Sequence, residues 1–397
     1  MDAEEARTIG RQVRQIRKAR RKSLRAAAEL AGMSKSHLQR IETGQRALDS
    51  RSETVALANV LEIAPSDLTA LPIPAPANGG TDLAVEAVRL ALMSVSCGRP
   101  GGDVVTVEEL RARVYELHPG GTSRNLKEVG AALPRLIRDL HTTLDAGRDV
   151  AELLDLAVLL HAQDTRGWLW IQSASLDLRW QAAALAQRLA QQRGTPTVLG
   201  VASWGAVVEM LASGAFDLAR DELDTVSVPT KGSAGMQLEG MLALSRSLVA
   251  ASSKRHQDVE PALDYAEEIA ERTGQGNAFW LGFGPTNVGL WRMASLLEVG
   301  EYDRAVAVAE GLNPQEHPSP ERRATYWADY GRALARLRGR HDDAVMAIRR
   351  AEHLHPTRVQ RNPFTRDVLA ELLPRTRRDS PTGRELRGMA YRAGLLV

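Results

Sequence analysis

The chain has 397 residues, of which 44% are hydrophobic and 25% are charged, the balance of a folded globular protein of about two to three domains. This composition excludes a wholly disordered chain, a collagen and a disulfide-stapled miniprotein. Cys97 is the single cysteine, so an internal disulfide and a cysteine zinc cluster are both excluded.

Positive charge is concentrated near the N-terminus, although the whole chain carries only +2. Between Arg7 and Arg46 there are twelve basic and two acidic residues, whereas residues 73–397 are close to neutral. A basic end of this kind predicts a polyanionic partner, with a solvated basic helix as the alternative.

No segment predicts a membrane anchor. The first twenty residues carry repeated charges and have no apolar signal core. The longest uncharged run, Thr273 to Trp291, contains five glycines and Pro285, so it does not predict a spanning helix. We therefore expect a cytoplasmic protein with no membrane partner.

Residues 1–71 predict a bundle of five short helices. Ser23 and Ser34 are suited to cap the second and third helices, and Gly32 suits the tight turn between them. The predicted helices cover Ala6–Arg20, Leu24–Ala31, Lys35–Thr43, Glu53–Leu61 and Pro65–Leu71.

The second and third of these helices form a helix-turn-helix pattern. Ala27, Leu30 and Leu38 are expected to pack them together, which leaves the polar face of the third helix for a DNA groove. An exposed polar surface without a partner is the alternative. The stretch from Ser23 to Arg46 resembles the Cro/phage-repressor (xenobiotic response element) helix-turn-helix family over about 60 residues. One departure is Leu24, which stands where many relatives carry a glutamine.

This resemblance implies a double-stranded DNA operator as partner. By the family's pattern, base contacts fall on the third helix, where arginine or lysine suits guanine and glutamine suits adenine. The expected base-contacting residues are Lys35, Ser36, His37, Gln39 and Arg40. The expected contacts to the DNA backbone are Arg17, Lys18, Arg20, Arg21, Lys22, Ser34 and Arg46.

A linker of alternating prolines followed by Asn-Gly-Gly is predicted over residues 72–80. Residues 81–397 follow as a second domain, helical almost throughout, since no segment shows sustained alternation of β-branched residues. The predicted fold is therefore all-α.

A repeated frame marks this second domain. Glycine, an aromatic residue or histidine two positions on, aspartate three on and alanine five on recur, ending at Ala219, Ala305 and Ala344, with a weaker copy at Ala262. A period near 40 residues indicates an α-solenoid of helix pairs. The region resembles degenerate tetratricopeptide repeats over about residues 149–356, with helical segments capping both ends.

Helix-turn-helix proteins with such repeats include actinobacterial regulators and peptide-responsive quorum-sensing regulators of Gram-positive bacteria. The resemblance implies a homodimer whose repeat domain senses a signal peptide or small molecule. Its register implies an inner groove formed by the first helix of each pair, with the packed core or a partner surface as the alternative. The expected groove residues are Trp204, Asn287, Trp291, Tyr326, Asp329 and Tyr330.

Enzymatic patterns are weak. The glycines at 274–284 follow no strand and lack a phosphate-binding Gly-Lys-Ser/Thr, and His161 and His353 lack metal-ligand spacing. We therefore expect no enzyme, no cofactor and no metal. The sequence favours a cytoplasmic, nucleoid-associated transcription regulator. The alternative is a protein-interaction scaffold or antitoxin-like partner in which DNA binding is secondary.

Overall fold

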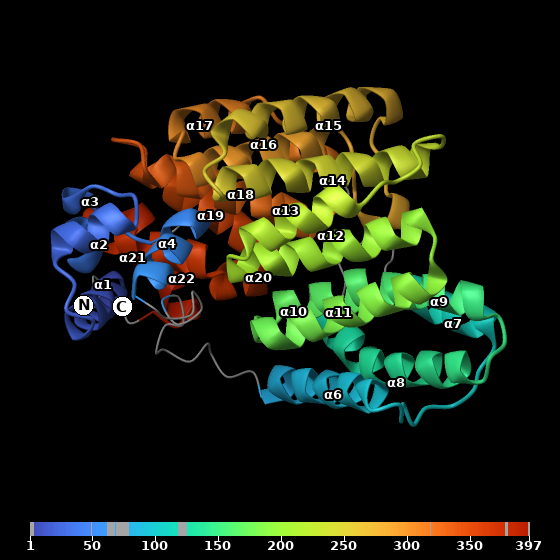
Figure 1. The fold of residues 1–397 in the computed structure, drawn as a ribbon. Coiled ribbons are helices and arrows are strands. Elements are labelled where there is room, and N and C mark those ends of the chain that lie inside the picture. Colours follow the sequence, from blue (N-terminus) through green and yellow to red (C-terminus); the bar gives the residue numbers. More distant parts are fainter. Residues whose placement is uncertain are drawn as a thin grey trace.

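A computed structural model describes residues 4–48, 50–61, 68, 79–117, 125–317, 319–377 and 380–395. Every regular element in these ranges is helical, and none is a strand, as the sequence predicts. Figure 1 shows a small N-terminal group of helices beside a longer stack that makes up the rest of the molecule.

Four N-terminal helices follow the predicted order: α1 (Glu4–Ala19), α2 (Leu24–Leu30), α3 (Lys35–Glu42) and α4 (Arg51–Leu61). Ser23 caps α2 by accepting a hydrogen bond from the Ala26 amide, as predicted. Gly32 adopts a positive φ of 66° in the turn between α2 and α3, which glycine tolerates without strain. Of the predicted fifth helix, only Leu68 lies within the described residues.

A core of aliphatic side chains holds these helices together. Val13, Leu38 and Leu57, from α1, α3 and α4, are fully buried in one cluster, which also includes Leu68. Leu30 is 66% exposed, so the prediction that it packs α2 against α3 is wrong; Ala27 and Ala28 fill that role. Leu30 is the last residue of α2, and its side chain lies on the face of the helix that is turned to solvent.

The stack begins with helices that cap its first end: α6 (Gly79–Ser96), α7 (Val107–Glu116) and α8 (Leu126–Asp145). Because α6 begins at Gly79, the last two residues of the predicted linker are helical; residues 72–78 lie outside the described part of the chain. Next come α9 (Val150–Leu159), a π-helical turn η1 (Leu160–Thr165) and α10 (Arg166–Ile171), which form one nearly continuous rod.

Paired helices follow α11 (Leu176–Arg193). The pairs are α12 (Pro196–Ser213) with α13 (Phe216–Thr225), α14 (Ser233–Ser252) with α15 (Val259–Thr273), α16 (Pro285–Val299) with α17 (Tyr302–Glu310), and α18 (Pro320–Ala335) with α19 (His341–Leu354). The first helix of each pair contacts the first helix of the next. Short 3₁₀ turns lie between some of them: η2 (His256–Asp258), η3 (Ala278–Trp280) and η4 (Pro314–Glu316).

The predicted frame explains the corners of these pairs. Gly214, Gly300 and Gly339 have φ values of 78°, 82° and 80°, the left-handed conformation that lets the chain reverse. Ala219, Ala305 and Ala344 are fully buried, where a larger side chain would separate the paired helices. The weaker copy fits less well, since Ala262 is only half-buried.

The C-terminal helices α20 (Pro356–Arg361), α21 (Pro363–Leu372) and α22 (Pro381–Arg392), with the 3₁₀ turn η5 (Leu373–Arg375), bring the chain back to its beginning. In Figure 1, α21 and α22 lie beside α1–α4, and α1 contacts α21 directly. The Ala47 amide donates to Glu371 at 3.2 Å, and Arg375 donates to the Gln45 carbonyl. The N-terminal helices are thus docked on the stack.

Within the described residues, α12 is long and apolar enough to cross a membrane by length and composition alone. It lies in the middle of the stack, and 61% of it is buried inside the fold. Such burial is what a core helix of a helical stack requires.

Candidate DNA-binding face and ligand cavity

Helix α3 presents a polar face to solvent. Ser34 caps it by accepting a hydrogen bond from the His37 amide at 3.1 Å, which fixes where the helix begins. Leu38 and Ile41 point into the core, so the other side of the helix is left exposed. The exposed side carries four of the predicted base-contacting residues: Lys35, Ser36, Gln39 and Arg40.

The other predicted base-contacting residue, His37, turns toward the protein. Its Nε2 lies 3.0 Å from the carboxylate of Glu53 on α4, and the side chain is half-buried. Arg46 is also turned inward: it donates to the Tyr302 hydroxyl at 3.1 Å and lies 3.9 Å from Glu53. Because His37 and Arg46 are engaged with the protein, their positions do not fit the DNA contacts expected of them.

Arg17 is a clearer correction among the expected backbone contacts. It is 8% exposed, and its guanidinium forms a two-pronged ion pair with Glu42, Nε–Oε1 2.5 Å and Nη2–Oε2 2.9 Å. The hydrogen bond to Glu42 raises the pKa of Arg17. A third nitrogen donates to the Lys22 carbonyl at 2.8 Å, so Arg17 ties α1 to α3 and does not face DNA.

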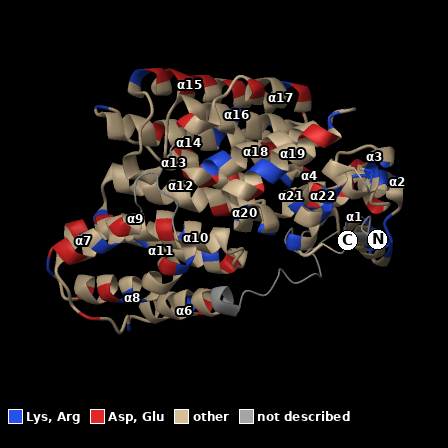
Figure 2. Ribbon diagram, turned by 180° about the vertical axis from the view of Figure 1, so that it is seen from behind, with Lys and Arg blue, Asp and Glu red and all other residues tan. Residues whose placement is uncertain are grey.

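The remaining basic residues stay at the surface. Lys18, Arg20 and Arg21 are exposed where α1 leads into α2, and Lys22 is half-buried. Figure 2 shows Lys and Arg on the end of the molecule that holds α1, α2 and α3. From the stack, the exposed Lys254 reaches the turn at Gly32, where a Cβ in place of the glycine hydrogen would lie 2.7 Å from its ammonium. Positive charge therefore surrounds the open face of α3.

Residues 8–71 match a family model described as a helix-turn-helix domain. No curated protein and no solved structure matches the chain. The match and the open face of α3 together support a DNA-binding helix-turn-helix regulator rather than an enzyme. A DNA-binding domain also suggests a cytoplasmic location.

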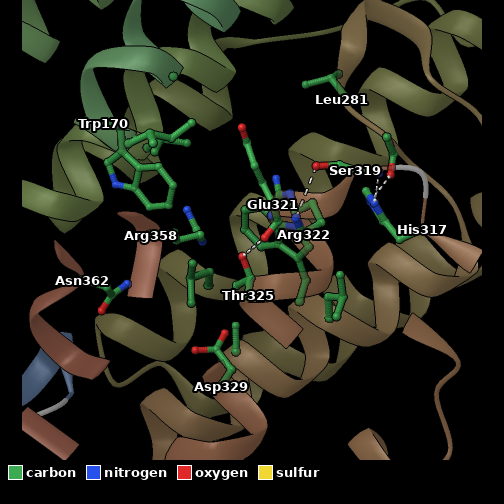
Figure 3. A pocket seen from close by; sticks show the side chains of 18 of the residues that line it. Trp170, Leu281, His317, Ser319, Glu321, Arg322, Thr325, Asp329, Arg358 and Asn362 are labelled. Carbon is green, nitrogen blue, oxygen red and sulfur yellow. Dashed lines mark hydrogen bonds between the residues drawn. The ribbon is translucent and has the colours of Figure 1, made fainter. Parts of the chain in front are cut away.

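A cavity of about 300 Å³ lies inside the stack, close to the docked N-terminal helices. Its walls come mainly from α10, α12, α16, α18 and α20. Figure 3 shows Trp170 and Arg358 on one side, with Glu321, Arg322 and Asp329 of α18 across from them. Ser319 begins this wall by capping α18, as its Ser-Pro sequence favours.

The cavity takes in three of the six predicted groove residues. Trp204, Trp291 and Asp329 line it, as their place on the first helix of each pair predicts. Asn287 does not: it is fully buried, and its amide nitrogen donates to the Met241 sulfur at 3.2 Å. Tyr326 donates to the Ala309 carbonyl and Tyr330 to Glu310, so both point between α17 and α18 instead. The prediction that Asn287, Tyr326 and Tyr330 line a groove is therefore wrong, because their side chains pack against neighbouring helices.

Aromatic and charged side chains line the cavity together. The tryptophans in its wall are Trp170, Trp204, Trp280 and Trp291. Five arginines and three carboxylates accompany them: Arg51, Arg166, Arg322, Arg332, Arg358, Glu298, Glu321 and Asp329. The lining therefore carries an excess of positive charge, and several guanidinium groups lie over aromatic rings.

Two histidines in the wall are neutral. Burial lowers the pKa of His317 to about 4. Its Nδ1 accepts from the Ser319 amide at 3.1 Å and its Nε2 lies 3.2 Å from the Gly282 carbonyl, an arrangement that the neutral ring satisfies. Burial also lowers the pKa of His355. Neither histidine therefore adds charge to the cavity at neutral pH.

The N-terminal helices form part of this site. Arg51, the first residue of α4, lines the cavity, and its guanidinium lies 3.5 Å from Glu298 of α16. A second cavity of about 440 Å³ adjoins the first and is lined by Arg51, Thr54 and Val55 of α4. Both cavities are therefore bounded in part by residues of α4.

The arginines of this cavity were not predicted from the sequence. Arg322 follows the Ser-Pro cap of α18, and Arg358 lies in the six-residue helix α20. Arg323 directly follows Arg322, and Arg361 lies three positions after Arg358, so neither arginine stands out from its sequence neighbours. Only the fold shows that they meet, because α20 returns to the stack after the last predicted repeat.

Proposed function

We propose that this protein is a sequence-specific transcription regulator of the Cro/phage-repressor type, with a tetratricopeptide-like sensor domain. The proposed domains are a DNA-binding domain at residues 1–71, a linker at 72–78 and a helical repeat domain from 79 onward. The observation that carries the proposal is the exposed face of α3, flanked by positive charge, on a domain that also forms part of a cavity wall.

Lys35, Ser36, Gln39 and Arg40 are the proposed base contacts, and Lys18, Arg20, Arg21, Lys22 and Ser34 the proposed contacts to the DNA backbone. One domain of this size covers limited DNA surface. Two copies reading a pseudo-palindrome are therefore part of the proposal, with dimerisation through the repeat domain and association with the nucleoid.

A ligand in the cavity, a signal peptide or small molecule, would regulate DNA binding by favouring one position of the DNA-binding domain over another. Arg51 supports this route, because it belongs to α4 yet lines the cavity beside Glu298. In this mechanism the ligand binds next to a residue of the DNA-binding domain, so its effect does not have to pass through a long series of contacts in the stack.

Selection of genomic fragments by the purified full-length protein, at moderate ionic strength, tests the regulator function. We expect enrichment of a defined operator over random duplex by about 10³-fold or more. The variant Gln39→Ala/Arg40→Ala should lose this preference, whereas Arg338→Ala, at an exposed turn of the stack, should keep it. No enrichment by the unaltered protein, together with a co-purifying protein partner, would instead favour the scaffold function.

A further inference from the structure

Two arginines face the central cavity without a carboxylate partner. Among the described residues, the guanidinium groups of Arg322 and Arg358 form no ion pair and no hydrogen bond, although their backbone amides are hydrogen-bonded. Each lies over a tryptophan ring instead: Arg358 is 3.9 Å from the centre of Trp170, and Arg322 is 5.8 Å from that of Trp291. Such stacking leaves the N–H edges of a guanidinium free to donate.

The surroundings of these two guanidinium groups disfavour their charge. Burial lowers the pKa of Arg322, and burial lowers that of Arg358 to about 10. A guanidinium in a protein stays protonated at neutral pH. Glu321 attracts both charges, whereas Arg166 repels that of Arg322, and Arg322 and then Arg51 repel that of Arg358. A half-buried charge that the protein compensates only in part can be compensated by a bound anion.

The carboxylates in the wall do not fully offset these charges. Asp329 is engaged by Arg332 at 2.8 Å, and Glu298 by the N-terminal end of α4. Glu321 attracts both arginines most strongly, and its own ion-pair contact is His355 at 3.9 Å, which is neutral. The positive excess therefore falls on Arg322 and Arg358, which lie on opposite sides of the cavity (Figure 3).

The wall also has an apolar part. Trp204, Leu290 and Leu281 are almost fully buried, and their side chains face the same cavity. A flat apolar group fits between such surfaces, and a volume of about 300 Å³ suits a small molecule. A free carboxylate can also come from the C-terminus of a peptide, which would have to enter with several residues.

We propose that the cavity binds a small organic acid, with its anionic group held between Arg322 and Arg358 and its flat apolar part against the tryptophans. This inference rests on the proposed function, because it names the class of ligand for the same sensor cavity. Since Arg51 shares the wall, the anion also draws on a residue of the DNA-binding domain.

Fluorescence titration of the full-length protein, without DNA, tests this inference. The probe is 8-anilinonaphthalene-1-sulfonate, an aromatic anion, and its uncharged counterpart is N-phenyl-1-naphthylamine. We expect the anion to bind saturably at one site per chain. Arg322→Met and Arg358→Met should each weaken it by about tenfold or more, because a charge-assisted hydrogen bond is lost. Arg323→Met, one position along α18 and outside the cavity lining, is the matched control.

Equal loss of the neutral probe, or unchanged binding of the anion in both variants, would overturn the proposal. Arg358→Lys keeps the charge, so it should bind the anion better than Arg358→Met even if the latter folds poorly. Displacement of the anionic probe by 2-naphthoate would support a small organic acid as the ligand. If 2-naphthoate fails and a peptide with a C-terminal tryptophan carboxylate displaces the probe, while the same peptide with a C-terminal amide does not, the ligand is a peptide and the proposed small acid is wrong. Because no DNA is present, a failed operator selection leaves this result interpretable.

Discussion

The guanidinium of Arg51 lies 3.5 Å from the carboxylate of Glu298, and this contact joins the DNA-binding domain to the wall of the cavity. Glu298 also accepts from the Ser52 amide and the Ser50 hydroxyl, both at 3.4 Å. One buried carboxylate on α16 therefore holds the N-terminal end of α4. A ligand anion that attracted Arg51 would compete for this same anchor.

Replacing Glu298 should weaken the attachment of α4 to the stack. Glu298→Gln keeps the shape of the side chain but removes its charge, so we expect a loss of about 1–3 kcal/mol in the free energy that holds α4 in place. Hydrogen exchange measured by mass spectrometry should show faster exchange in residues 51–61. Glu301→Gln, which alters an exposed carboxylate three residues further along the chain, between α16 and α17, is the control. Unchanged exchange at α4 in Glu298→Gln would contradict the assigned anchor.

Arg17 should act on stability and not on DNA affinity. Arg17→Met leaves Glu42 buried without its partner, and we expect the N-terminal domain to lose about 3–5 kcal/mol. The double variant Arg17→Met/Glu42→Leu should regain most of this loss, because both charges are gone. Since no tryptophan lies in residues 1–71, hydrogen exchange of α1 and α3 is the suitable measurement.

The salt dependence of DNA binding separates this role from a phosphate contact. If Arg17 only joins α1 to α3, the double variant binds the operator with the unaltered salt slope. A slope reduced by about one would place Arg17 on the DNA backbone after all.

Arg40 and Arg21 should affect DNA binding in different ways. Arg40 is exposed on the open face of α3, so Arg40→Ala should relax base preference at one operator position, at a cost of about 1–3 kcal/mol. Arg21 is exposed where α1 leads into α2, so Arg21→Ala should weaken all duplexes alike and reduce the salt slope by about one. Binding to the operator and to single-base variants, over a range of salt, makes the comparison; identical behaviour of the two variants would refute these roles.

Acid should destabilise the fold well above the pH at which its carboxylates titrate. Burial lowers the pKa of His141 and that of His317 to about 4, from 6.5 in the unfolded chain. Between pH 6.5 and pH 4, these two histidines are therefore protonated in the unfolded chain and neutral in the folded protein. Above pH 6.5 both states leave these histidines neutral, and the free energy of unfolding has its full value. As the pH falls toward 4 this free energy decreases, by about 3 kcal/mol in total for each histidine.

Urea unfolding between pH 7.5 and 4.5 checks this dependence. His317→Asn should lower the stability at neutral pH and flatten its decline in acid, because one of the buried groups no longer titrates. His256→Asn changes an exposed histidine and serves as control. A decline as steep in His317→Asn as in the unaltered protein would show that His317 does not contribute.

Local sequence signals predicted the helices well. Ser23, Ser34 and Ser319 cap helices in the structure as their types and positions indicate, and each glycine corner of the repeat frame precedes a buried alanine. These features depend on neighbours a few residues away, so periodicity and capping rules suffice. The same rules predicted the open face of α3.

Features that depend on distant contacts were not predictable. Arg17 looks like its exposed neighbours in the sequence, and only the packing of α1 on α3 brings it to Glu42. The register that placed Trp204, Trp291 and Asp329 on the cavity also placed Asn287 there, because a small rotation about the helix axis separates a lining position from a buried one. Arg358 required the return of α20, which no repeat pattern indicates.

The hydrogen bond from Ala47 to Glu371 has a consequence for the order in which the protein is made. A ribosome adding roughly 5–20 residues per second reaches Glu371 about 15–60 s after Leu61. During that interval the first domain has emerged without the helix on which it will rest, and its own small core must keep it folded. For about 15–60 s each newly made copy thus carries a DNA-binding domain that no later helix yet restrains.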